Sequence, residues 1–425
     1  MNNMKKITVL IFSILTVIVL FSCNKKSETK VNKVISAKEI LGNPDFLAIS
    51  YGGYREKSRE VQPTLEELKE DMKILSAMGI KILRTYNVHL EQASNLLEAI
   101  QQLKEEDPNF NMYVMLGAWI DCKNAFNKQN IEPDHNLESE RNTVEINTAV
   151  TLANKYPEIV KIIAVGNEAM VKWAASYYVQ PSVILKWVTH LQDLKKSKGL
   201  PADLWITSSD DYTSWGGGDS VYHTKDLEKL IHTVDYISMH TYPFHNSHYN
   251  SDFWEIPENE NTLTDKEKVD AAMLRALNFA KKQYDTVSNY MKSIGANKPI
   301  HIGETGWATT SNGFYGENGS RATDEYKQGL YYSHLREWTN KENISCFYFE
   351  AFDEQWKDAE NEKGSENHFG LLTINGKAKY PLWNLVDKGV FKNVSRNGNP
   401  ITKSYNGKLD SLMKDVFVPN TNYSK

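Results

Sequence analysis

Cysteine is scarce in this chain of 425 residues, which contains only Cys23, Cys122 and Cys346. Cys122 lies just beyond the carboxyl end of one predicted strand, whereas Cys346 begins another. The last two thiols are therefore expected at opposite ends of a sheet. Because a disulfide requires Cα atoms within about 7 Å of each other, we predict two isolated thiols and no disulfide framework.

Basic patches, glycine-rich phosphate loops and long flexible linkers are also missing. The formal net charge of −5 argues against a nucleic-acid partner, which would require a basic surface. No glycine-rich fingerprint follows the first predicted strand, and this disfavours an open, doubly wound sheet that binds a dinucleotide. No linker divides residues 39–390, and Asp121, Asp134 and His135 are not spaced as a metal-ligand set. We therefore predict a single domain without a metal or another cofactor, and we expect it to be a monomer.

The amino terminus has the features of an export signal. Two lysines precede an apolar stretch over residues 7–21 that is too short for a stable membrane span. The following junction resembles a bacterial lipobox, in which Cys23 is lipidated and begins the mature chain. Phe21 departs from the small residue preferred there, so cleavage by an ordinary signal peptidase stays an alternative. We predict a signal peptide over residues 1–22, a flexible tether over residues 23–38, and an exported cell-envelope lipoprotein on a periplasmic or outer membrane surface.

Short apolar runs recur along the chain, and each is typical of a strand that is buried on both faces. The clearest example ends abruptly in Gly, Asn and Glu. The predicted strands are Phe46–Tyr51, Ile80–Tyr86, Met112–Trp119, Ile159–Glu168, Leu204–Ser209, Val234–Tyr242, Pro299–Thr305 and Ser345–Ala351.

Amphipathic segments alternate with these runs. Thr64 and Glu67 form a capping box, after which apolar residues follow at spacings of three and four. Further predicted helices are Leu90–Lys104, Ser139–Lys155, Ser182–Lys198, Lys225–His232, Lys266–Ile294, Asp324–Asn340 and Trp383–Val390. Eight strands alternating with eight helices are most economically closed into a (β/α)8 TIM barrel. We predict this α/β barrel over residues 39–391 and a polar C-terminal tail over residues 392–425.

Two glutamates end apolar runs in matching contexts. Glu168 follows Asn167 after residues 159–166, and Glu304 ends the run of residues 299–303. Active sites of parallel barrels lie at the carboxyl ends of the strands. A structural ion pair would explain either glutamate alone, whereas two in the same context favour paired catalytic carboxylates. Glycosidic bond hydrolysis requires such a pair, because one carboxylic acid protonates the leaving oxygen while the other attacks the anomeric carbon or activates water.

Polar residues at other strand ends suit a site around these glutamates. Asn167 can donate to a sugar 2-hydroxyl, a hydrogen bond that strengthens in the transition state. Arg84 can keep a nucleophilic carboxylate ionised, and Tyr242 can donate to the same carboxylate. His240 points the same way as Tyr242, so it either lines the site or is a satisfied structural histidine. Tyr51, at the end of the first predicted strand, is a further candidate.

Aromatic residues make up 11% of the chain, and several lie in segments that follow predicted strands. Aromatic faces suit the C–H surfaces of pyranose rings. Trp187 lies on a predicted helix and is expected in the core. Trp215, Trp254 and Trp307 lie beside glycine-rich or polar turns, so we predict that they line a sugar-binding groove.

Five motifs resemble the retaining glycoside hydrolases of family seventeen, whose barrels carry catalytic glutamates on strands four and seven. These motifs are Val165-Gly166-Asn167-Glu168, Gly303-Glu304-Thr305-Gly306-Trp307, Phe349-Glu350-Ala351-Phe352-Asp353-Glu354-Gln355-Trp356-Lys357, Leu83-Arg84-Thr85-Tyr86 and Met115-Leu116-Gly117-Ala118-Trp119. The resemblance covers residues 46–390. Gln355 stands where proline is common in that family.

The resemblance implies hydrolysis of β-1,3-linked glucan with retention of configuration. Carried over by position, Glu168 is the acid/base and Glu304 the nucleophile. Retention requires the two carboxyl groups to lie roughly 5–5.5 Å apart. The other carried-over residues, which support the site or bind sugar, are Tyr86, Trp119, Glu350 and Lys357.

Three functions are compatible with these residues. The first is hydrolysis of laminarin-type β-1,3-glucan or its oligosaccharides, and the second is transfer to another sugar by the same two glutamates. The third is glycan binding by a barrel that has lost catalysis, which the presence of both glutamates disfavours. Endo or exo action stays open, because it depends on whether the insertion His245–Leu263 closes one end of the groove.

Overall fold

The computed structural model describes residues 35–421 apart from residues 128 and 130. The predicted signal peptide, the predicted lipidation site at Cys23 and most of the predicted tether lie outside these residues. Within the described part of the chain, no helix is both long and apolar enough to cross a membrane.

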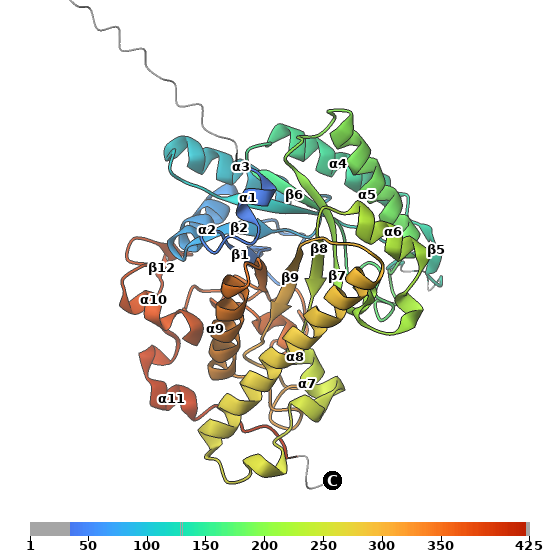
Figure 1. Ribbon diagram of the computed structural model, residues 1–425. Helices are drawn as coiled ribbons and strands as arrows, with labels where there is room; N and C mark the ends of the chain where they lie inside the picture. Colours follow the sequence, from blue (N-terminus) through green and yellow to red (C-terminus); the bar gives the residue numbers. More distant parts are fainter. Residues whose placement is uncertain (1–34, 128, 130, 422–425) are drawn as a thin grey trace, which may run out of the picture. The chain divides into compact units, whose positions relative to one another are not determined.

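Eight parallel strands close into a barrel, as predicted (Figure 1). Around the ring the strands follow the order β1–β10–β9–β8–β7–β6–β3–β2. Each strand therefore pairs with the barrel strands that precede and follow it along the chain, which excludes the open, doubly wound sheet. The barrel strands are β1 (Leu47–Ser50), β2 (Ile80–Arg84), β3 (Tyr113–Ala118), β6 (Val160–Asn167), β7 (Trp205–Asp211), β8 (Ile237–His240), β9 (Ile300–Gly306) and β10 (Cys346–Phe349).

Helices lie between the strands in sequence, and all eight predicted amphipathic segments are helical. They are α2 (Leu65–Ala77), α3 (Glu91–Glu106), α4 (Arg141–Lys155), α5 (Pro181–Lys196), α6 (Lys225–Thr233), α8 (Asp265–Ser293), α9 (Glu325–Lys341) and α10 (Trp383–Asp387). The predicted capping box at the start of α2 is confirmed, because the backbone N–H of Thr64 donates to Glu67 and its hydroxyl accepts from the backbone N–H of Glu67.

Several short elements were not predicted, because they are too short to show a hydrophobic period. They are α1 (Ala37–Ile40), α7 (Pro243–Tyr249), α11 (Leu409–Met413), β4 (Cys122–Lys123), β5 (Asp134–Glu138), β11 (Ser395–Arg396) and β12 (Asn399–Pro400). Single turns of 3₁₀ or π helix lie at Thr213–Gly217, Ser220–Tyr222, Ser251–Phe253, Glu258–Glu260, Ser365–His368, Tyr380–Leu382 and Ser404–Gly407.

The strand residues fill two apolar cores in alternation. Ile82 and Ile162 belong to the inner core, whereas the next residues along, Leu83 and Ile163, belong to the larger core that includes the surrounding helices. Because successive strand residues point to opposite faces, this arrangement covers both faces of each strand. Continuous apolar runs are therefore required here instead of a polar–apolar alternation.

The amino end of the described chain belongs to the barrel and not to a tether. Ala37 and Ile40 of α1 are fully buried, and they join the inner core that contains Ile82 and Ile162. The predicted domain boundary at residue 39 is therefore wrong. Four helical residues carry too little pattern to distinguish a buried turn from a polar linker.

The two described cysteines are unpaired, as predicted. Cys122 lies in β4 and Cys346 begins β10, and both are buried. Burial raises the pKa of each thiol to about 11. Both thiols are therefore protonated at neutral pH, when they are poor nucleophiles.

The segment predicted as a polar tail folds back onto the barrel, and this corrects the predicted boundary at residue 391. Arg396 is fully buried and donates to Asp71 of α2 over 2.9 Å. Arg55 and Tyr51 donate to the same carboxylate, each over 3.0 Å. Figure 1 shows the C-terminal elements in red, with β12 near α2 and α11 beside α9. Further on, the backbone N–H of Ile256 donates to Asn420.

Replacement of Asp71 by Asn should destabilise the protein strongly, because it leaves two arginines facing a neutral amide. Removing one partner from a buried ion pair costs about 3–5 kcal/mol. The free energy of unfolding can be measured by urea titration. The control is Asp193→Asn, which breaks an ion pair with Lys196 that is largely solvent-exposed and should leave the urea midpoint nearly unchanged. Equal midpoints for the two variants would show that the C-terminal segment contributes no stability through Asp71.

Candidate active site

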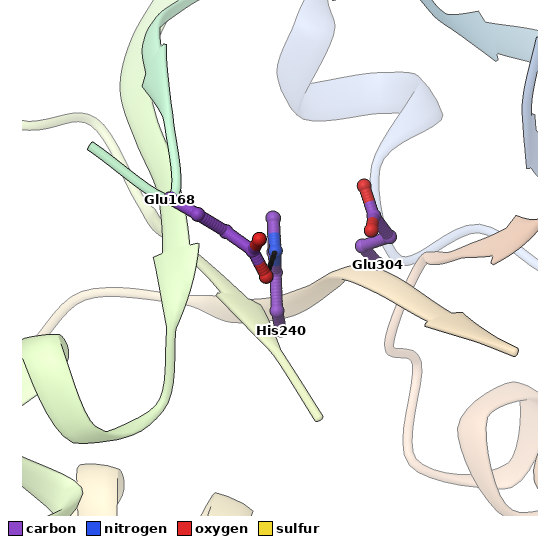
Figure 2. Close-up of side chains that lie close together, drawn as sticks. All are labelled: Glu168, His240 and Glu304. Atoms are coloured by element: carbon purple, nitrogen blue, oxygen red, sulfur yellow. Dashed lines mark hydrogen bonds and ion pairs between the residues drawn. The ribbon is translucent and has the colours of Figure 1, made fainter. Parts of the chain in front are cut away.

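Glu168 and Glu304 meet at the mouth of the barrel although their strands are not neighbours. Glu168 directly follows β6 and Glu304 lies in β9, with β7 and β8 between these two strands. Figure 2 shows both side chains directed toward a common space, with His240 of β8 beside Glu168. One carboxylate oxygen of each glutamate and one ring nitrogen of His240 lie within 4.8 Å of one another. This separation suits a retaining pair, whereas inverting pairs are roughly 6.5–9.5 Å apart.

Glu304 is surrounded by hydrogen-bond donors. Arg84 Nη1 donates to its Oε2 over 2.7 Å, and the Tyr86 hydroxyl donates to the same oxygen over 2.8 Å. The Tyr242 hydroxyl donates to Oε1 over 2.6 Å. Burial raises the pKa of Glu304, but the charge of His240 when it is protonated, the charge of Arg84 and the tyrosine hydrogen bonds outweigh it, so the pKa lies below its ordinary value. Glu304 is therefore ionised, as a nucleophile must be.

Glu168 has the opposite electrostatic environment. Burial, followed by repulsion from Glu304 and Asp211, raises the pKa of Glu168 well above its ordinary value. The carboxyl group is therefore held protonated, as a general acid requires. Its backbone N–H donates to Ser209 over 3.0 Å, and its backbone φ of 47° is an unfavourable left-handed conformation. The next turn is secured by Asp210, whose Oδ2 accepts from the backbone N–H of Met170 over 2.7 Å.

His240 is hydrogen-bonded to Glu168 and not to Glu304. Its Nδ1 lies 3.0 Å from Oε1 of Glu168, and its Nε2 lies 2.8 Å from the hydroxyl oxygen of Ser209. Burial lowers the pKa of His240 to about 4. The imidazole is therefore neutral at pH 7, so Arg84 is the cation that keeps Glu304 ionised. His240 lines the site, which resolves the two roles that the sequence left open.

Arg84 also orients Asn167. Its Nη2 donates to the Asn167 side-chain oxygen over 2.5 Å. Because a guanidinium has donors only, it must face the amide oxygen, and the amide NH₂ is left to point elsewhere. That NH₂ is the group expected to donate to a sugar 2-hydroxyl.

The eighth-strand motif forms a charged network behind an aromatic wall. Lys357 Nζ donates to Glu350, lies 3.6 Å from Glu354, and sits 3.9 Å from the centre of the Phe349 ring. Phe349 in turn packs edge-on against Tyr86. Glu350 is buried, and the side chain of Lys357, its ion-pair partner, is 11% exposed; this pairing favours support of the site over direct contact with sugar.

The three tryptophans predicted to line a groove are buried instead. Trp215, Trp254 and Trp307 are at most 1% exposed, and they belong to the larger core. Their indole N–H groups donate to the backbone oxygens of Ser238, Ser320 and Ala322, respectively. The prediction is wrong because core side chains surround these rings instead of solvent: Trp254 and Trp307 pack against each other, and Trp307 also contacts Phe244 and Tyr331.

Two further predicted site residues lie in different surroundings. Tyr51 is buried, and its hydroxyl donates to Asp71 and not to either glutamate, so the structure contradicts its predicted role. Trp119 is partly buried and packs 5.1 Å from Tyr177 in a cluster with Phe126.

Sequence reasoning missed Tyr177 and His245. Tyr177 lies in the turn after Glu168, and its backbone oxygen accepts from Cys122 over 3.0 Å. The His245 ring stacks on Tyr242 with centroids 4.9 Å apart. For both residues the available signal was their position in a segment that follows a barrel strand, β6 for Tyr177 and β8 for His245.

The groups around Glu168 and Glu304 suit acid/base chemistry better than they suit the binding of a metal ion. Both oxygens of Glu304 already accept hydrogen bonds from Arg84, Tyr86 and Tyr242. A metal ion bound between the two glutamates would also be repelled by the Arg84 guanidinium. The chemistry available here is proton transfer at Glu168 and nucleophilic attack by Glu304.

A comparison with protein families matches residues 48–370 to the BtgE/BtgC glycoside hydrolase domain. Among curated proteins, the chain is 22% identical over 383 residues to the "Probable glucan endo-1,3-beta-glucosidase btgC" of Aspergillus flavus, with 84% of this chain and 47% of that protein covered. It is 24% identical to the BtgC protein of Aspergillus niger, with 73% of this chain and 39% of that protein covered. The chain thus spans less than half the length of these two relatives.

Among solved structures, the chain is similar to an endo-laminarinase from Formosa Hel1_33_131. The two share 63% sequence identity and a TM-score of 0.90, over 91% of this chain and 98% of that chain. A family 17 β-1,3-glucanosyltransferase from Rhizomucor miehei shares the fold, at 20% identity and a TM-score of 0.53, over 79% of this chain and 96% of that chain. The predicted resemblance to family seventeen is therefore confirmed. Because the matched span carries both glutamates and the barrel strands that hold them, the chain belongs to the family of BtgE/BtgC glycoside hydrolase domains.

Proposed function

We propose that this chain is an endo-acting β-1,3-glucanase that hydrolyses laminarin-type glucan with retention of configuration. The main support for this proposal is the geometry of Glu168 and Glu304. Their carboxylate oxygens lie within 4.8 Å of each other, and their pKa values are shifted in opposite directions. The 63% identity with an endo-laminarinase over nearly the full length of that chain supports β-1,3-glucan as the substrate and endo action as the mode.

The first chemical step uses both carboxyl groups in their resting states. Glu304 attacks the anomeric carbon of the bound sugar while protonated Glu168 gives its proton to the glycosidic oxygen. The bond between that carbon and that oxygen breaks, and a covalent glucosyl ester forms on Glu304. The Asn167 amide donates to the 2-hydroxyl of the same sugar.

The second step follows from the change in charge. Once Glu304 is an ester, its negative charge no longer raises the pKa of Glu168, which can now exist as a carboxylate. Glu168 takes a proton from water, the resulting hydroxide equivalent attacks the anomeric carbon, and the ester bond to Glu304 breaks. Two inversions at one carbon produce net retention.

Substitution of the two glutamates should separate their roles. Glu168→Ala should lower turnover of soluble β-1,3-glucan about 10²–10⁴-fold, the usual contribution of general acid/base catalysis. Azide replaces only the water of the second step, so its effect is measured on an aryl β-laminarioside, whose leaving group departs without a general acid. On that substrate azide, which needs no general base, should restore turnover of Glu168→Ala and yield a β-glycosyl azide. Glu304→Ala should yield no β-azide, because the ester cannot form. Products can be identified by chromatography and NMR.

The matched control for this experiment is Glu228→Ala, which removes a carboxyl group from α6 and should leave turnover unchanged.

Wild type acting on laminarihexaose should release only shorter chains. Chains longer than the substrate would identify sugar, instead of water, as the acceptor. An α-azide from Glu168→Ala would contradict retention.

The pH dependence of kcat/KM should be bell-shaped, because activity requires ionised Glu304 and protonated Glu168. Activity rises with pH through the pKa of Glu304 and falls through the pKa of Glu168. Tyr242→Phe removes a hydrogen bond to ionised Glu304, which raises the pKa of that glutamate. A hydrogen bond to a charged group contributes about 1.5–3 kcal/mol and one pKa unit equals about 1.4 kcal/mol, so the acid limb should move up by about one to two pH units.

The alkaline limb of Tyr242→Phe should move less, because Tyr242 does not contact Glu168. Tyr332→Phe, which alters a tyrosine of α9 outside the site, is the control and should leave both limbs in place. An unchanged acid limb in Tyr242→Phe would contradict the assignment of Glu304 as the group that titrates there.

We also propose that the chain is exported and anchored to a cell-envelope membrane through lipid at Cys23. The basic start and the apolar stretch over residues 7–21 support this proposal. In bacteria fed an alkyne fatty acid, the full chain should become labelled and sediment with membranes, whereas Cys23→Ala should not be labelled. A soluble, unlabelled wild-type protein would support cleavage by an ordinary signal peptidase.

A further inference from the structure

A pocket of about 520 Å³ opens beside the catalytic centre, between the loops that follow β1, β2 and β3. Ligand pockets typically measure roughly 300–1,000 Å³. Trp119 and Phe126 provide apolar lining, whereas Arg59, His89 and Arg141 provide polar lining. The mixture of aromatic faces and hydrogen-bond donors suits a sugar ring, which has apolar C–H faces and hydroxyl groups at its edge.

Phe126 is held in a position that core packing does not explain. The residue is 54% exposed, and its backbone φ of 51° is unfavourable for a bulky side chain. Its ring stacks on Tyr177 with centroids 5.2 Å apart, and Tyr177 lies 5.1 Å from Trp119. Strained backbone of this kind is concentrated at functional sites, and the strain here presents an aromatic face to solvent.

A buried glutamate keeps the pocket preformed. Glu145 of α4 accepts from the backbone N–H groups of Val88 over 2.7 Å and of Trp119 over 3.0 Å, and its other oxygen lies 3.0 Å from His89 Nδ1. Its side chain is only 4% exposed. Glu145 therefore ties the loop after β2 to the loop after β3 and fixes the backbone that carries Trp119.

The pocket lies next to the catalytic centre, and two of its lining residues lead toward it. Asn87 lines the pocket and directly follows Tyr86, whose hydroxyl donates to Glu304. On the other side, Trp119 lines the pocket and its ring lies 5.1 Å from that of Tyr177. Tyr177 is close to Glu168, because burial raises the pKa of the tyrosine and the charge of the Glu168 carboxylate raises it further. A glucan chain that passes between the two glutamates can therefore extend into this pocket.

Arg141 supplies hydrogen-bond donors at the rim. Its Nη2 donates to Asp121 over 2.6 Å, while 65% of the side chain is exposed. Its Nε donates to Ser139, and Nη2 also reaches the backbone oxygen of Ala125. Of the five N–H donors of the guanidinium, the two on Nη1 are therefore left for sugar hydroxyls. Arg59 and His89 also line a neighbouring pocket, which is bordered by Trp356. The two pockets therefore form one longer surface.

We propose that this pocket is a remote subsite that binds a glucosyl residue of the β-1,3-glucan chain being cleaved at Glu168 and Glu304. The inference rests on the proposed function, because the occupant is a further unit of the same substrate. The subsite increases the affinity of long chains over short ones by stacking a sugar ring on Phe126 and Trp119.

The test compares chain lengths in wild type and in Phe126→Ala. For each protein, kcat/KM is measured on laminaritriose through laminariheptaose, and the heptaose-to-triose ratio is calculated. Loss of one aromatic face should lower this ratio about fivefold to tenfold, mainly through KM. Titration of laminariheptaose into the inactive Glu304→Gln background should show the same weakening when Phe126→Ala is added.

The control is Phe46→Ala, which removes a partly buried aromatic ring just before β1, at the opposite end of the barrel, and should leave the ratio unchanged. Equal losses on all chain lengths in Phe126→Ala would overturn the subsite and assign Phe126 to support of the catalytic loop. An unchanged ratio would overturn it as well. If wild type cleaves none of these oligosaccharides, the proposed function itself fails, which is a distinct result.

Discussion

The ion pair between Arg84 and Glu304 is the interaction on which the site depends. Arg84 is buried and reaches three partners: the Glu304 carboxylate, the backbone oxygen of Gly303 and the side chain of Asn167. One guanidinium thereby links residues of β2, β6 and β9 across the barrel mouth. A buried charge is tolerated only when it is paired and hydrogen-bonded, so the closed barrel that supplies these partners is a condition for the site.

The division of work between the two glutamates follows from this pair. Glu304 lies beside the Arg84 cation and accepts hydrogen bonds from tyrosine hydroxyls. Glu168, in contrast, is buried near other carboxylates and beside a neutral imidazole. Two carboxyl groups in one small space resist simultaneous ionisation. The environment therefore decides which of them is ionised. In the proposed mechanism the same repulsion vanishes when Glu304 becomes an ester, so the acid of the first step can act as the base of the second.

Aromatic residues show why sequence position alone is a weak guide to a binding surface. Trp254 and Trp307 lie after barrel strands, yet both are buried and contact each other with centroids 5.5 Å apart. Phe126, which no motif singled out, is exposed and stacked on Tyr177. Whether a loop covers a ring or presents it depends on the contacts of the loop with segments distant in sequence, and these contacts leave no local pattern.

The sequence by itself determined the barrel, because strands buried on both faces and helices buried on one face leave different apolar periods. It also located Glu168, Glu304 and Arg84, because charged residues that end apolar runs are conspicuous. Only the tertiary structure shows why Glu168 and not Glu304 is held protonated, that Tyr51 turns to Asp71, and that residues 392–421 belong to the domain. Each of these depends on partners far away along the chain; Arg396 and Asp71, for example, are 325 residues apart. The burial of a side chain, the electrostatic field at a carboxyl group and the ion pairs between side chains all depend on that spatial arrangement. No local stretch of sequence contains them.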